Sequence, residues 1–401
     1  MADLEFIKAI AIPSPAKIVL LVLDGLGGLP RPETGKTELE SARKPNLDRL
    51  AAEGVCGLTD PVSPGITPGS APGHLALFGY EPSRFNIGRG VLEAVGIDFE
   101  LQPGDIAARG NFCTVDKTGL ITDRRAGRIS TEKCIELCRL LDGLVIDEVK
   151  VMVRPGKDYR FTAIFRGDGL APDLSDSDPQ QAGMAPLEIT ATHPGATRTA
   201  SIANQFVVRA KTLLAKHRPA NMILLRGFSQ HPHLPSMAEI YQLKPAAIAS
   251  YPMYRGLARL VGMEVLKTGT SIADEFNTLV ENYAKYDFFF LHVKGADAAG
   301  EDGDFARKTQ VIEQVDDELP RLMELKPDVI VVTGDHSTPA LLKGHSWHPV
   351  PLLLFSRWCR RDKVSDFGES ACLLGGLGRI PATQVMSLAM ANALKLNKFG
   401  A

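Results

Sequence analysis

The sequence predicts an α/β fold: a mostly parallel sheet flanked by helices, with a smaller α+β domain inserted into it. Toward both ends of the chain, continuous apolar runs alternate with segments of helical periodicity, whereas short segments in the middle alternate polar with apolar residues. Continuous apolar runs are typical of parallel strands buried on both faces, and alternation is typical of half-exposed strands. We therefore expect a core domain at 1–95 and 190–401 and an inserted domain at 96–189.

Four apolar runs are predicted to be buried strands of the core domain, because they combine β-branched residues with leucine and end in turn residues. These strands are expected at 18–23, 221–225, 286–293 and 328–333. The segments between them have helical periodicity and recognisable end signals. The helices are expected at 45–53, 200–216, 271–284 and 305–325.

The inserted domain is predicted from a different pattern. Residues 107–114 and 160–166 alternate polar with apolar side chains, and a helix is expected at 131–141 between them. Such strands form a sheet that is covered on one face and exposed on the other. Residues 167–195 are rich in Asp, Pro, Ser and Gly, which predicts a loop at the domain boundary.

Charge and hydropathy argue against several classes of protein. The 45 Lys and Arg residues nearly balance 47 Asp and Glu, and a net charge of -2 argues against a dedicated nucleic-acid or anionic-membrane binder. No apolar run approaches the roughly 20 residues that a membrane-spanning helix needs. The N-terminal segment lacks a signal-peptide pattern. We expect a cytoplasmic protein whose six scattered cysteines are reduced thiols.

Three aspartates, Asp24, Asp297 and Asp335, fall at or just after the ends of predicted strands. The carboxyl ends of parallel strands share one edge of a sheet, so these carboxylates should converge and need a cation or a shared proton. The neighbouring side chains of ligand type are Glu301, His336 and His345. Mixed carboxylate and imidazole ligands suit Mn²⁺ or Zn²⁺, with Mg²⁺ possible where oxygens dominate. Taken singly, an Asp-Gly turn or a buried histidine needs no metal, but three strand ends together favour a metal site.

A Gly/Pro-rich loop leads into an apolar helical run at Ser70. A serine at this junction lies near the amides and the positive dipole end of a helix, which favour a phosphate or an alkoxide. The alternative is an N-cap without a catalytic role, since serine is a common N-cap. The segment lacks the Gly-Lys-Ser/Thr ending of a nucleotide-binding P-loop.

The inserted domain is rich in arginine, a side chain that pairs bidentately with carboxylates and phosphates. These arginines are Arg109, Arg124, Arg125, Arg128, Arg154, Arg160 and Arg166. The densest patch is Asp123–Arg128. It is either a solvated loop or, near a metal site, a clamp for an anionic substrate.

Together, these residues resemble the alkaline-phosphatase superfamily and, within it, the archaeal-type cofactor-independent phosphoglycerate mutases. The resemblance runs nearly end to end and implies an alkaline-phosphatase-like core with an inserted substrate-binding cap. It rests on the order and spacing of short motifs: Val22–Gly25, Thr67–Ser70 with His74, Gly88–Glu93, Asp123–Arg128, His292–Asp297, Thr333–Ser337, and His345 before Pro349–Pro351.

The resemblance implies a site for two divalent metal ions and no requirement for 2,3-bisphosphoglycerate. Mn²⁺ is the expected metal, with Mg²⁺, Co²⁺ or Zn²⁺ as alternatives. One ion would be held by Asp24, Ser70, Asp335 and His336, and the other by Asp297, Glu301 and His345. The superfamily has histidine where this chain has Glu301, which moves the metal preference toward harder ions. The segment 71–73 also lacks an acidic residue found in some relatives.

The implied activity is the interconversion of 3-phosphoglycerate and 2-phosphoglycerate, a step of glycolysis and gluconeogenesis, through a phosphoserine at Ser70. The small phosphorylated carboxylate would be bound by Arg109, Arg124, Arg125, Arg128, Arg160 and Lys294. One alternative is a metal-dependent phosphotransferase or phosphatase on another small metabolite, for example in homoserine phosphotransfer. A second is a catalytically dead metal- or phosphate-binding protein. The sequence predicts no nucleic-acid or membrane partner and no particular oligomeric state.

Overall fold

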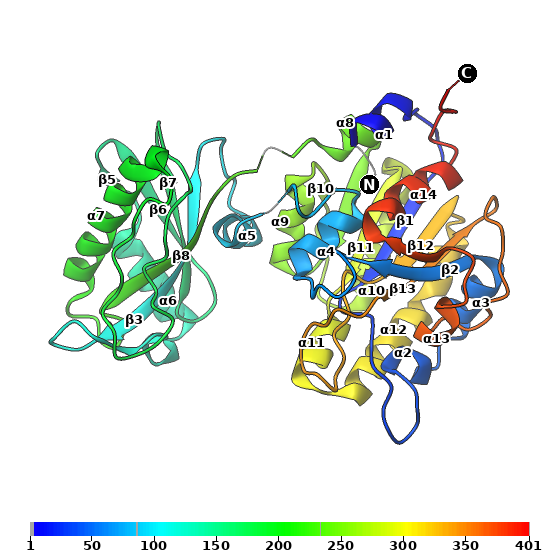
Figure 1. Ribbon diagram of the computed structural model, residues 1–401, viewed down its shortest axis with the longest axis horizontal. Helices are drawn as coiled ribbons and strands as arrows, with labels where there is room; N and C mark the ends of the chain where they lie inside the picture. The colour runs from blue at the N-terminus through cyan, green and yellow to red at the C-terminus, as the bar shows by residue number, and fades with distance from the viewer. Residues whose placement is uncertain (1–3, 86, 233, 401) are drawn as a thin grey trace. The chain divides into compact units, whose positions relative to one another are not determined.

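The computed structural model describes residues 4–85, 87–232 and 234–400 (Figure 1). The chain divides into a core unit, Met1–Asn86 with Leu234–Ala401, and an inserted unit, Ile87–His233. The predicted α/β class with an inserted smaller α+β part is confirmed. The unit boundaries differ from the expected ones, because the inserted unit begins before residue 96 and continues well beyond residue 189.

The core unit contains an eight-stranded sheet with the strand order β10-β9-β11-β1-β12-β13-β2-β14 among the described residues. Its strands are β1 (Ile18–Leu23), β2 (Val55–Asp60), β9 (Pro245–Ala249), β10 (Glu264–Val265), β11 (Phe288–Val293), β12 (Val329–Thr333), β13 (Val350–Ser356) and β14 (Gly378–Pro381). β1 lies between β11 and β12 and is parallel to both, with Leu21 opposite Leu291 and Val332. β13 runs antiparallel to its neighbours, so the sheet is mostly parallel, as predicted.

Helices cover this sheet on both faces (Figure 1). They are α1 (Leu4–Ile10), α2 (Glu38–Ser41), α3 (Pro45–Glu53), α4 (Ser70–Leu77), α8 (Met237–Tyr241), α9 (Pro252–Leu260), α10 (Ile272–Asn282), α11 (Gly295–Asp302), α12 (Phe305–Glu324), α13 (Glu369–Cys372) and α14 (Val385–Asn392), with short 3-10 turns at Tyr283–Lys285 and Ala382–Gln384.

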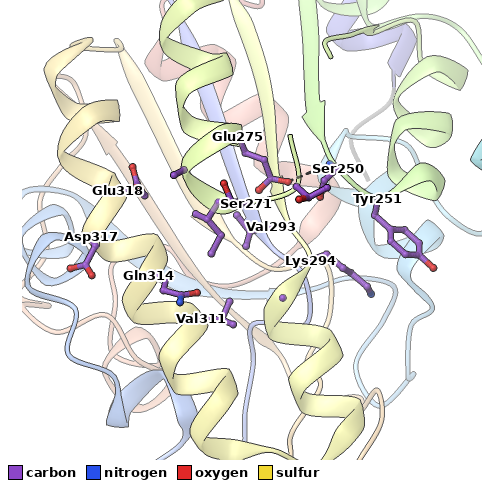
Figure 2. Close-up of a pocket in the computed structure, with 14 residues that line it drawn as sticks. Ser250, Tyr251, Ser271, Glu275, Val293, Lys294, Val311, Gln314, Asp317 and Glu318 are labelled. Atoms are coloured by element: carbon purple, nitrogen blue, oxygen red, sulfur yellow. Dashed lines mark hydrogen bonds between the residues drawn. The ribbon is translucent and has the colours of Figure 1, made fainter. Parts of the chain in front are cut away.

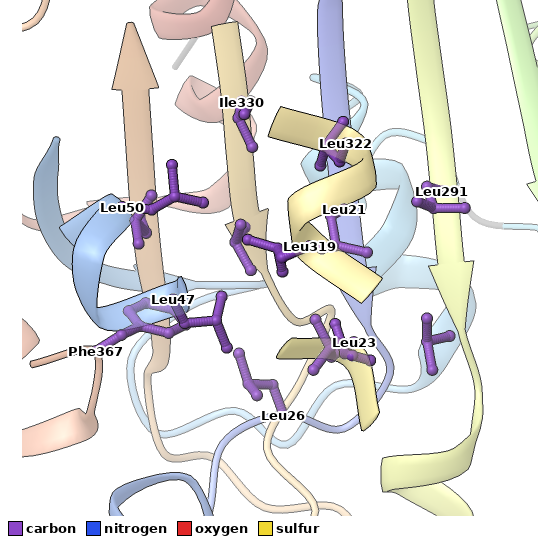
Figure 3. Packing of buried hydrophobic residues seen from close by; sticks show 14 of the residues in the cluster. Leu21, Leu23, Leu26, Leu47, Leu50, Leu291, Leu319, Leu322, Ile330 and Phe367 are labelled. Atoms are coloured by element: carbon purple, nitrogen blue, oxygen red, sulfur yellow. The ribbon is translucent and has the colours of Figure 1, made fainter. Parts of the chain in front are cut away.

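The core of this unit is built from the apolar runs that predicted the strands. Every residue of β1 is buried. Leu21 of β1 and Ile330 of β12 belong to one buried cluster with Leu47 of α3 and Leu319 of α12 (Figure 3). Burying a leucine side chain contributes about 1.5–3 kcal/mol, so this cluster holds β1, β11 and β12 in a fixed register.

Local signals account for the ends of several helices. Pro45 occupies the first turn of α3, where its missing N–H is not needed, and Gly54 follows the last residue. The Ser271 hydroxyl accepts a hydrogen bond from the Asp274 N–H at 3.1 Å, and the Asp274 carboxylate accepts one from the Ser271 N–H, a reciprocal capping box that starts α10. Gly303, with φ of 75°, ends α11 in the left-handed conformation that glycine adopts most readily.

The inserted unit contains a second, antiparallel sheet. Its elements are α5 (Arg89–Gly96), β3 (Ile106–Val115), β4 (Ile121–Asp123), α6 (Thr131–Leu141), β5 (Leu144–Ile146), β6 (Val149–Pro155), β7 (Arg160–Arg166), α7 (Thr197–Leu214) and β8 (Met222–Gln230), with 3-10 turns at Ala126–Arg128 and Pro194–Ala196. The prediction that 221–225 is a core strand was wrong: β8 pairs antiparallel with β3. The polar loop at 167–195 is hydrogen-bonded to β8. The Ser177 N–H donates to the Leu225 carbonyl at 2.9 Å, and the Asp176 carboxylate accepts from the Gly227 N–H at 2.8 Å.

The sheet of the inserted unit is covered more completely than its alternation suggests. α6 and α7 pack over one face, where Leu137 and Phe206 join a buried cluster with Phe161. α5 packs on β3 and β8. The fit is close, because a side-chain carbon added at Gly90 would lie 1.9 Å from the Ala107 carbonyl oxygen. The expectation of one exposed face was therefore wrong.

Two further expectations concern thiols and membranes. All six cysteines are free thiols, as predicted. In the described part of the chain, no helix has both the length and the apolar composition needed to cross a bilayer.

Candidate metal centre and nucleophile

The ends of β1, β11 and β12 bring three buried aspartates to one edge of the core sheet. Asp24 follows β1 directly, Asp335 comes just after β12, and Asp297 lies in the first turn of α11, which follows β11. The three residues are at most 1% exposed. They meet because β1 lies between the other two strands and runs in the same direction.

Two groups of ligand-type atoms form at this edge. Asp24, Asp335 and His336 make the first group, and Asp297, His336 and His345 make the second. Within each group the candidate ligand atoms lie within 4.8 Å of one another. His336 belongs to both groups. The family resemblance implied instead that His336 binds one ion only and that Glu301 is a ligand of the other.

The donor atoms of the first group suit a divalent cation. Both carboxylate oxygens of Asp24 and Oδ2 of Asp335 are buried, and within the described chain they have no hydrogen-bond partner. Buried carboxylate oxygens that accept no hydrogen bond are costly, and a bound cation would compensate their charge. In the second group, the His345 ring is oriented by its Nδ1, which donates to the Pro68 carbonyl at 2.9 Å. Its Nε2 is therefore the nitrogen that is free to bind a metal, and it lies 3.5 Å from Asp297 Oδ1.

Ser70 lies beside this centre. It is the first residue of α4, and its Oγ is 3.2 Å from His336 Nε2. The N-cap of α4 is Gly69, and within the described residues the Ser70 hydroxyl pairs with His336 and not with an N–H of its own helix, so the alternative of a simple helix cap does not apply. Gly73 allows α4 to approach the ligand loop closely, because a side-chain carbon there would lie 2.2 Å from the Asp335 carbonyl oxygen.

Two buried histidines near the aspartates, His74 and His292, were quoted as parts of motifs in the sequence analysis but were given no role in the site. His74 Nδ1 donates to the Ser70 carbonyl at 2.8 Å and lies 3.1 Å from Asp335 Oδ2. His292 Nε2 lies 3.2 Å from Asp24 Oδ2. Position gave a usable signal for both: His74 is one helical turn after Ser70, and His292 is next to the last residue of β11.

The charges of the centre are strongly coupled. Burial opposes ionisation of Asp335, yet His336 and His74 outweigh it and hold the pKa of this carboxyl well below its usual range. Burial likewise opposes the charge on His336, but the Asp335 carboxylate raises the pKa of the imidazole to about 9. Positive charge is therefore favoured at the point where the carboxylates meet.

Comparison with known proteins identifies the family of this chain. The profile of the 2,3-bisphosphoglycerate-independent phosphoglycerate mutases matches residues 51–221. A Thermosipho melanesiensis protein named "Probable 2,3-bisphosphoglycerate-independent phosphoglycerate mutase" is 50% identical, covering 99% of each chain. A Deinococcus radiodurans protein of the same name is 50% identical over 100% of each chain. The chain belongs to the 2,3-bisphosphoglycerate-independent phosphoglycerate mutase family.

Two solved structures have folds similar to that of this phosphoglycerate mutase family member. A Pyrococcus horikoshii protein superposes with a TM-score of 0.83 and 30% identity, covering 96% of this chain and 99% of that one. A cofactor-independent phosphoglycerate mutase from Thermoplasma acidophilum superposes with a TM-score of 0.78 and 32% identity, covering 94% of this chain and 100% of that one.

Lys294, which was predicted to bind substrate, lies against two of the aspartates of the candidate centre. Its ammonium contacts the Asp297 carboxylate, lies 3.2 Å from Asp24 Oδ2, and donates to the Tyr254 hydroxyl at 3.1 Å. Burial opposes its charge, but the two carboxylates outweigh burial and raise the pKa of Lys294. Lys294 therefore balances part of the negative charge that Asp24 and Asp297 bring together.

Glu301 lies at the rim of the centre. Its side chain is 55% exposed, and Oε1 is 3.8 Å from His345 Nε2. The atoms of the second ligand group come from Asp297, His336 and His345 without it. Its neighbour Asp302 pairs with Arg307 at 2.8 Å.

The predicted arginines differ in how they are engaged. Arg124 binds the buried Asp178 carboxylate through two hydrogen bonds of 3.0 and 2.6 Å, so its charge is already paired. Arg125 and Arg128 are exposed. Arg109 is half-buried and lies 3.3 Å from Glu93. Burial, together with the like charges of Arg160 and Arg89, lowers the pKa of Arg109, so three guanidinium groups gather on this part of the inserted unit.

A cavity of about 720 Å³ lies beside Lys294 in the core unit (Figure 2). It is lined by Ser250, Ser271, Val293 and the buried Glu275, and by none of the candidate metal ligands. The Glu275 Oε1 accepts a hydrogen bond from the Ser250 N–H at 3.3 Å. Burial raises the pKa of Glu275 from its ordinary 4.5 to about 8.

The raised pKa of Glu275 predicts a dependence of stability on pH. Between pH of about 4.5 and about 8, the folded chain keeps a proton that the unfolded chain has released, so this group's contribution to the free energy of unfolding falls as pH rises. Glu275→Gln removes that fall. At about 1.4 kcal/mol per pKa unit, raising the pH from 5 to 8.5 should increase the free energy of unfolding of the variant, relative to that of the wild type, by on the order of 2–4 kcal/mol.

Urea unfolding at the two pH values measures this difference. Glu281→Gln changes an exposed carboxylate on the same helix and serves as the control. If the free energy of unfolding changes between the two pH values by the same amount in Glu275→Gln, Glu281→Gln and the wild type, Glu275 is not protonated in the folded state.

Proposed function

We propose that the chain interconverts 3-phosphoglycerate and 2-phosphoglycerate through a phosphoserine at Ser70. The observation that carries this proposal is the Ser70 hydroxyl, which is not engaged in capping its helix and lies 3.2 Å from His336 Nε2, beside the two groups of buried ligand atoms. Relatives that are 50% identical over nearly the full length are named as mutases of this kind.

The first half of the reaction forms the phosphoserine. Ser70 Oγ forms a bond to phosphorus while the bond between phosphorus and the glycerate oxygen breaks. The proton released by the serine hydroxyl balances the one taken up by the leaving oxygen. In the second half, the other glycerate hydroxyl attacks the phosphoserine and restores Ser70. The position of Ser70 at the start of α4 places the phosphoryl group at the positive end of a helix dipole.

The buried ligand groups are proposed to hold two divalent ions. Asp24, Asp335, His336 and Ser70 would hold one, and Asp297 and His345, with Glu301 from the rim, would hold the other. Mn²⁺ is the proposed metal, with Mg²⁺, Co²⁺ or Zn²⁺ as alternatives, because the donors combine carboxylate and imidazole. Bound ions would lower the pKa of the serine hydroxyl and compensate charge on the phosphoryl oxygens.

The inserted unit is proposed to supply the cations that bind the substrate's carboxylate. Arg109 and Arg160 are the better candidates among the predicted arginines. Arg124 is held by two hydrogen bonds to the buried Asp178 carboxylate, whereas Arg109 has one longer contact of 3.3 Å with the partly exposed Glu93. Arg89 belongs with them, although the sequence analysis did not select it. A cluster of like charges is most stable when an anion is bound to it.

A mutase assay tests the proposal. Purified protein with Mn²⁺ should convert 3-phosphoglycerate to 2-phosphoglycerate, detected by coupling to enolase, without added 2,3-bisphosphoglycerate. Inorganic phosphate is measured in the same samples. Release of phosphate without 2-phosphoglycerate would indicate a phosphatase instead, and absence of both products would favour a binding protein or a different substrate.

Glu301 offers a separate test of the second ion. If its carboxylate swings toward His345 and completes that group, Glu301→Ala should weaken binding of one Mn²⁺ by about 10–100-fold, and Glu301→His should retain most of the affinity. Isothermal titration of Mn²⁺ measures this. Asp302→Ala is the control, since Asp302 is also exposed on α11 but pairs with Arg307. Identical titrations for Glu301→Ala and Asp302→Ala would show that Glu301 is not a ligand.

A further inference from the structure

Thr338 connects the two groups of candidate metal ligands. Its Oγ1 lies 2.7 Å from Asp297 Oδ1 and 2.9 Å from His336 Nδ1. The residue is fully buried, as are both of its partners. One hydroxyl therefore contacts a member of each group. It reaches His336 on the ring nitrogen opposite Nε2, and Asp297 on Oδ1, the oxygen that His345 Nε2 also approaches.

The directions of these hydrogen bonds follow from their chemistry. The ionised Asp297 carboxylate has no proton to donate, so the Thr338 hydroxyl donates to it. Because the hydroxyl has only one hydrogen, its oxygen must accept from His336, and the proton of the imidazole resides on Nδ1. Nε2 is then the nitrogen that faces Ser70 Oγ at 3.2 Å and Asp335 Oδ2 at 3.1 Å. A divalent ion bound at Nε2 would take the place of a proton on that nitrogen, while Nδ1 keeps its own.

The main chain of Thr338 is held as firmly as its side chain. Its N–H donates to the Gly27 carbonyl at 3.0 Å, and its own carbonyl accepts from Lys308 Nζ at 2.9 Å. Lys308 is fully buried and also donates to the Gly27 carbonyl at 2.9 Å. A side-chain carbon added at Gly25 would lie 2.6 Å from Thr338 Oγ1, so the neighbouring loop leaves the hydroxyl little room to move.

We infer that Thr338 is a positioning residue that sets the Nδ1–H tautomer of His336 and orients Asp297 for metal binding. The inference rests on the proposed two-ion site. Residues behind metal ligands commonly change metal affinity by about 10–100-fold when they are replaced. Losing the hydroxyl would free the His336 ring to rotate or change tautomer and would leave Asp297 Oδ1 without its donor.

Thr338→Ala and Thr338→Ser test this inference as a pair, because both lack the methyl group and differ only in the hydroxyl. In isothermal titration, Thr338→Ser should bind Mn²⁺ within about threefold of the wild type, whereas Thr338→Ala should bind at least one ion about 10–100-fold more weakly. With Co²⁺ as the probe, the visible absorption spectrum of Thr338→Ala should differ from that of the wild type, and Thr338→Ser should restore it.

Thr333→Ala is the control for loss of a buried hydroxyl. Thr333 is also fully buried, and its Oγ1 donates to the Pro351 carbonyl at 2.8 Å. This variant should lose stability without losing Mn²⁺ affinity. Equal Mn²⁺ affinity and equal Co²⁺ spectra for Thr338→Ala and Thr338→Ser overturn the inference alone. A wild-type protein that binds no Mn²⁺ overturns both the inference and the two-ion site.

Discussion

Ser70→Ala is expected to lower mutase turnover by roughly 10⁴-fold or more, because removing a nucleophile leaves only binding and electrostatic stabilisation. The Ser70 oxygen is the atom proposed to bond to phosphorus, and no other hydroxyl lies as close to His336 Nε2 among the hydrogen bonds of the described residues. The fold should remain intact, because Gly69 and not Ser70 caps α4. Enolase-coupled rates and a thermal unfolding curve measure the two properties separately.

Ser63→Ala is a suitable control for the nucleophile. Ser63 is exposed in the same loop between β2 and α4 and should be replaceable without loss of rate. If Ser70→Ala keeps near-wild-type turnover, the nucleophile lies elsewhere. The first residue to test would then be Thr67, which is exposed in that loop.

Removing divalent ions should have the second largest effect. Chelation followed by desalting is expected to reduce turnover by at least about 10³-fold, and added Mn²⁺ should restore it. Without a divalent ion, the buried Asp24 and Asp335 carboxylates face Lys294 and neighbouring histidines, but three of their oxygens accept no hydrogen bond from the described residues. Metal should also stabilise the fold, by about 2.7 kcal/mol when its free concentration is 100 times the Kd.

Both readouts of metal removal are needed. Urea unfolding with and without Mn²⁺ reports binding to the folded chain, and the coupled assay reports its importance for turnover. Full turnover in metal-free protein would contradict the proposed chemistry. Lost turnover without any change in unfolding would show that the ion acts on the substrate and not on this site.

The convergence of the aspartates was accessible from sequence because it depends only on strand direction. A strand that is buried and parallel to its neighbours must present its last residue at the same edge, so Asp24 and Asp335 could be paired without knowing any side-chain geometry. Sharing of His336 between two groups could not be anticipated, since it depends on distances of a few ångströms between loops.

Other errors have equally specific causes. The first part of β8, residues 222–225, is as apolar as a core strand. Its partner β3 lies more than a hundred residues earlier in the chain, so composition alone did not reveal its sheet. Arg124 was selected for the density of charge around it. The carboxylate that neutralises it, Asp178, is distant in sequence and lies in a loop that was expected to mark a domain boundary.

The most direct test of the central claim is to locate the phosphoryl group on the enzyme. Protein with Mn²⁺ is mixed with 3-phosphoglycerate, quenched in acid during turnover, digested and analysed by mass spectrometry. The account predicts a phosphorylated peptide with the modification on Ser70, absent without substrate and absent in Ser70→Ala. Turnover without any phosphopeptide, or with the phosphoryl group on another residue, would contradict it.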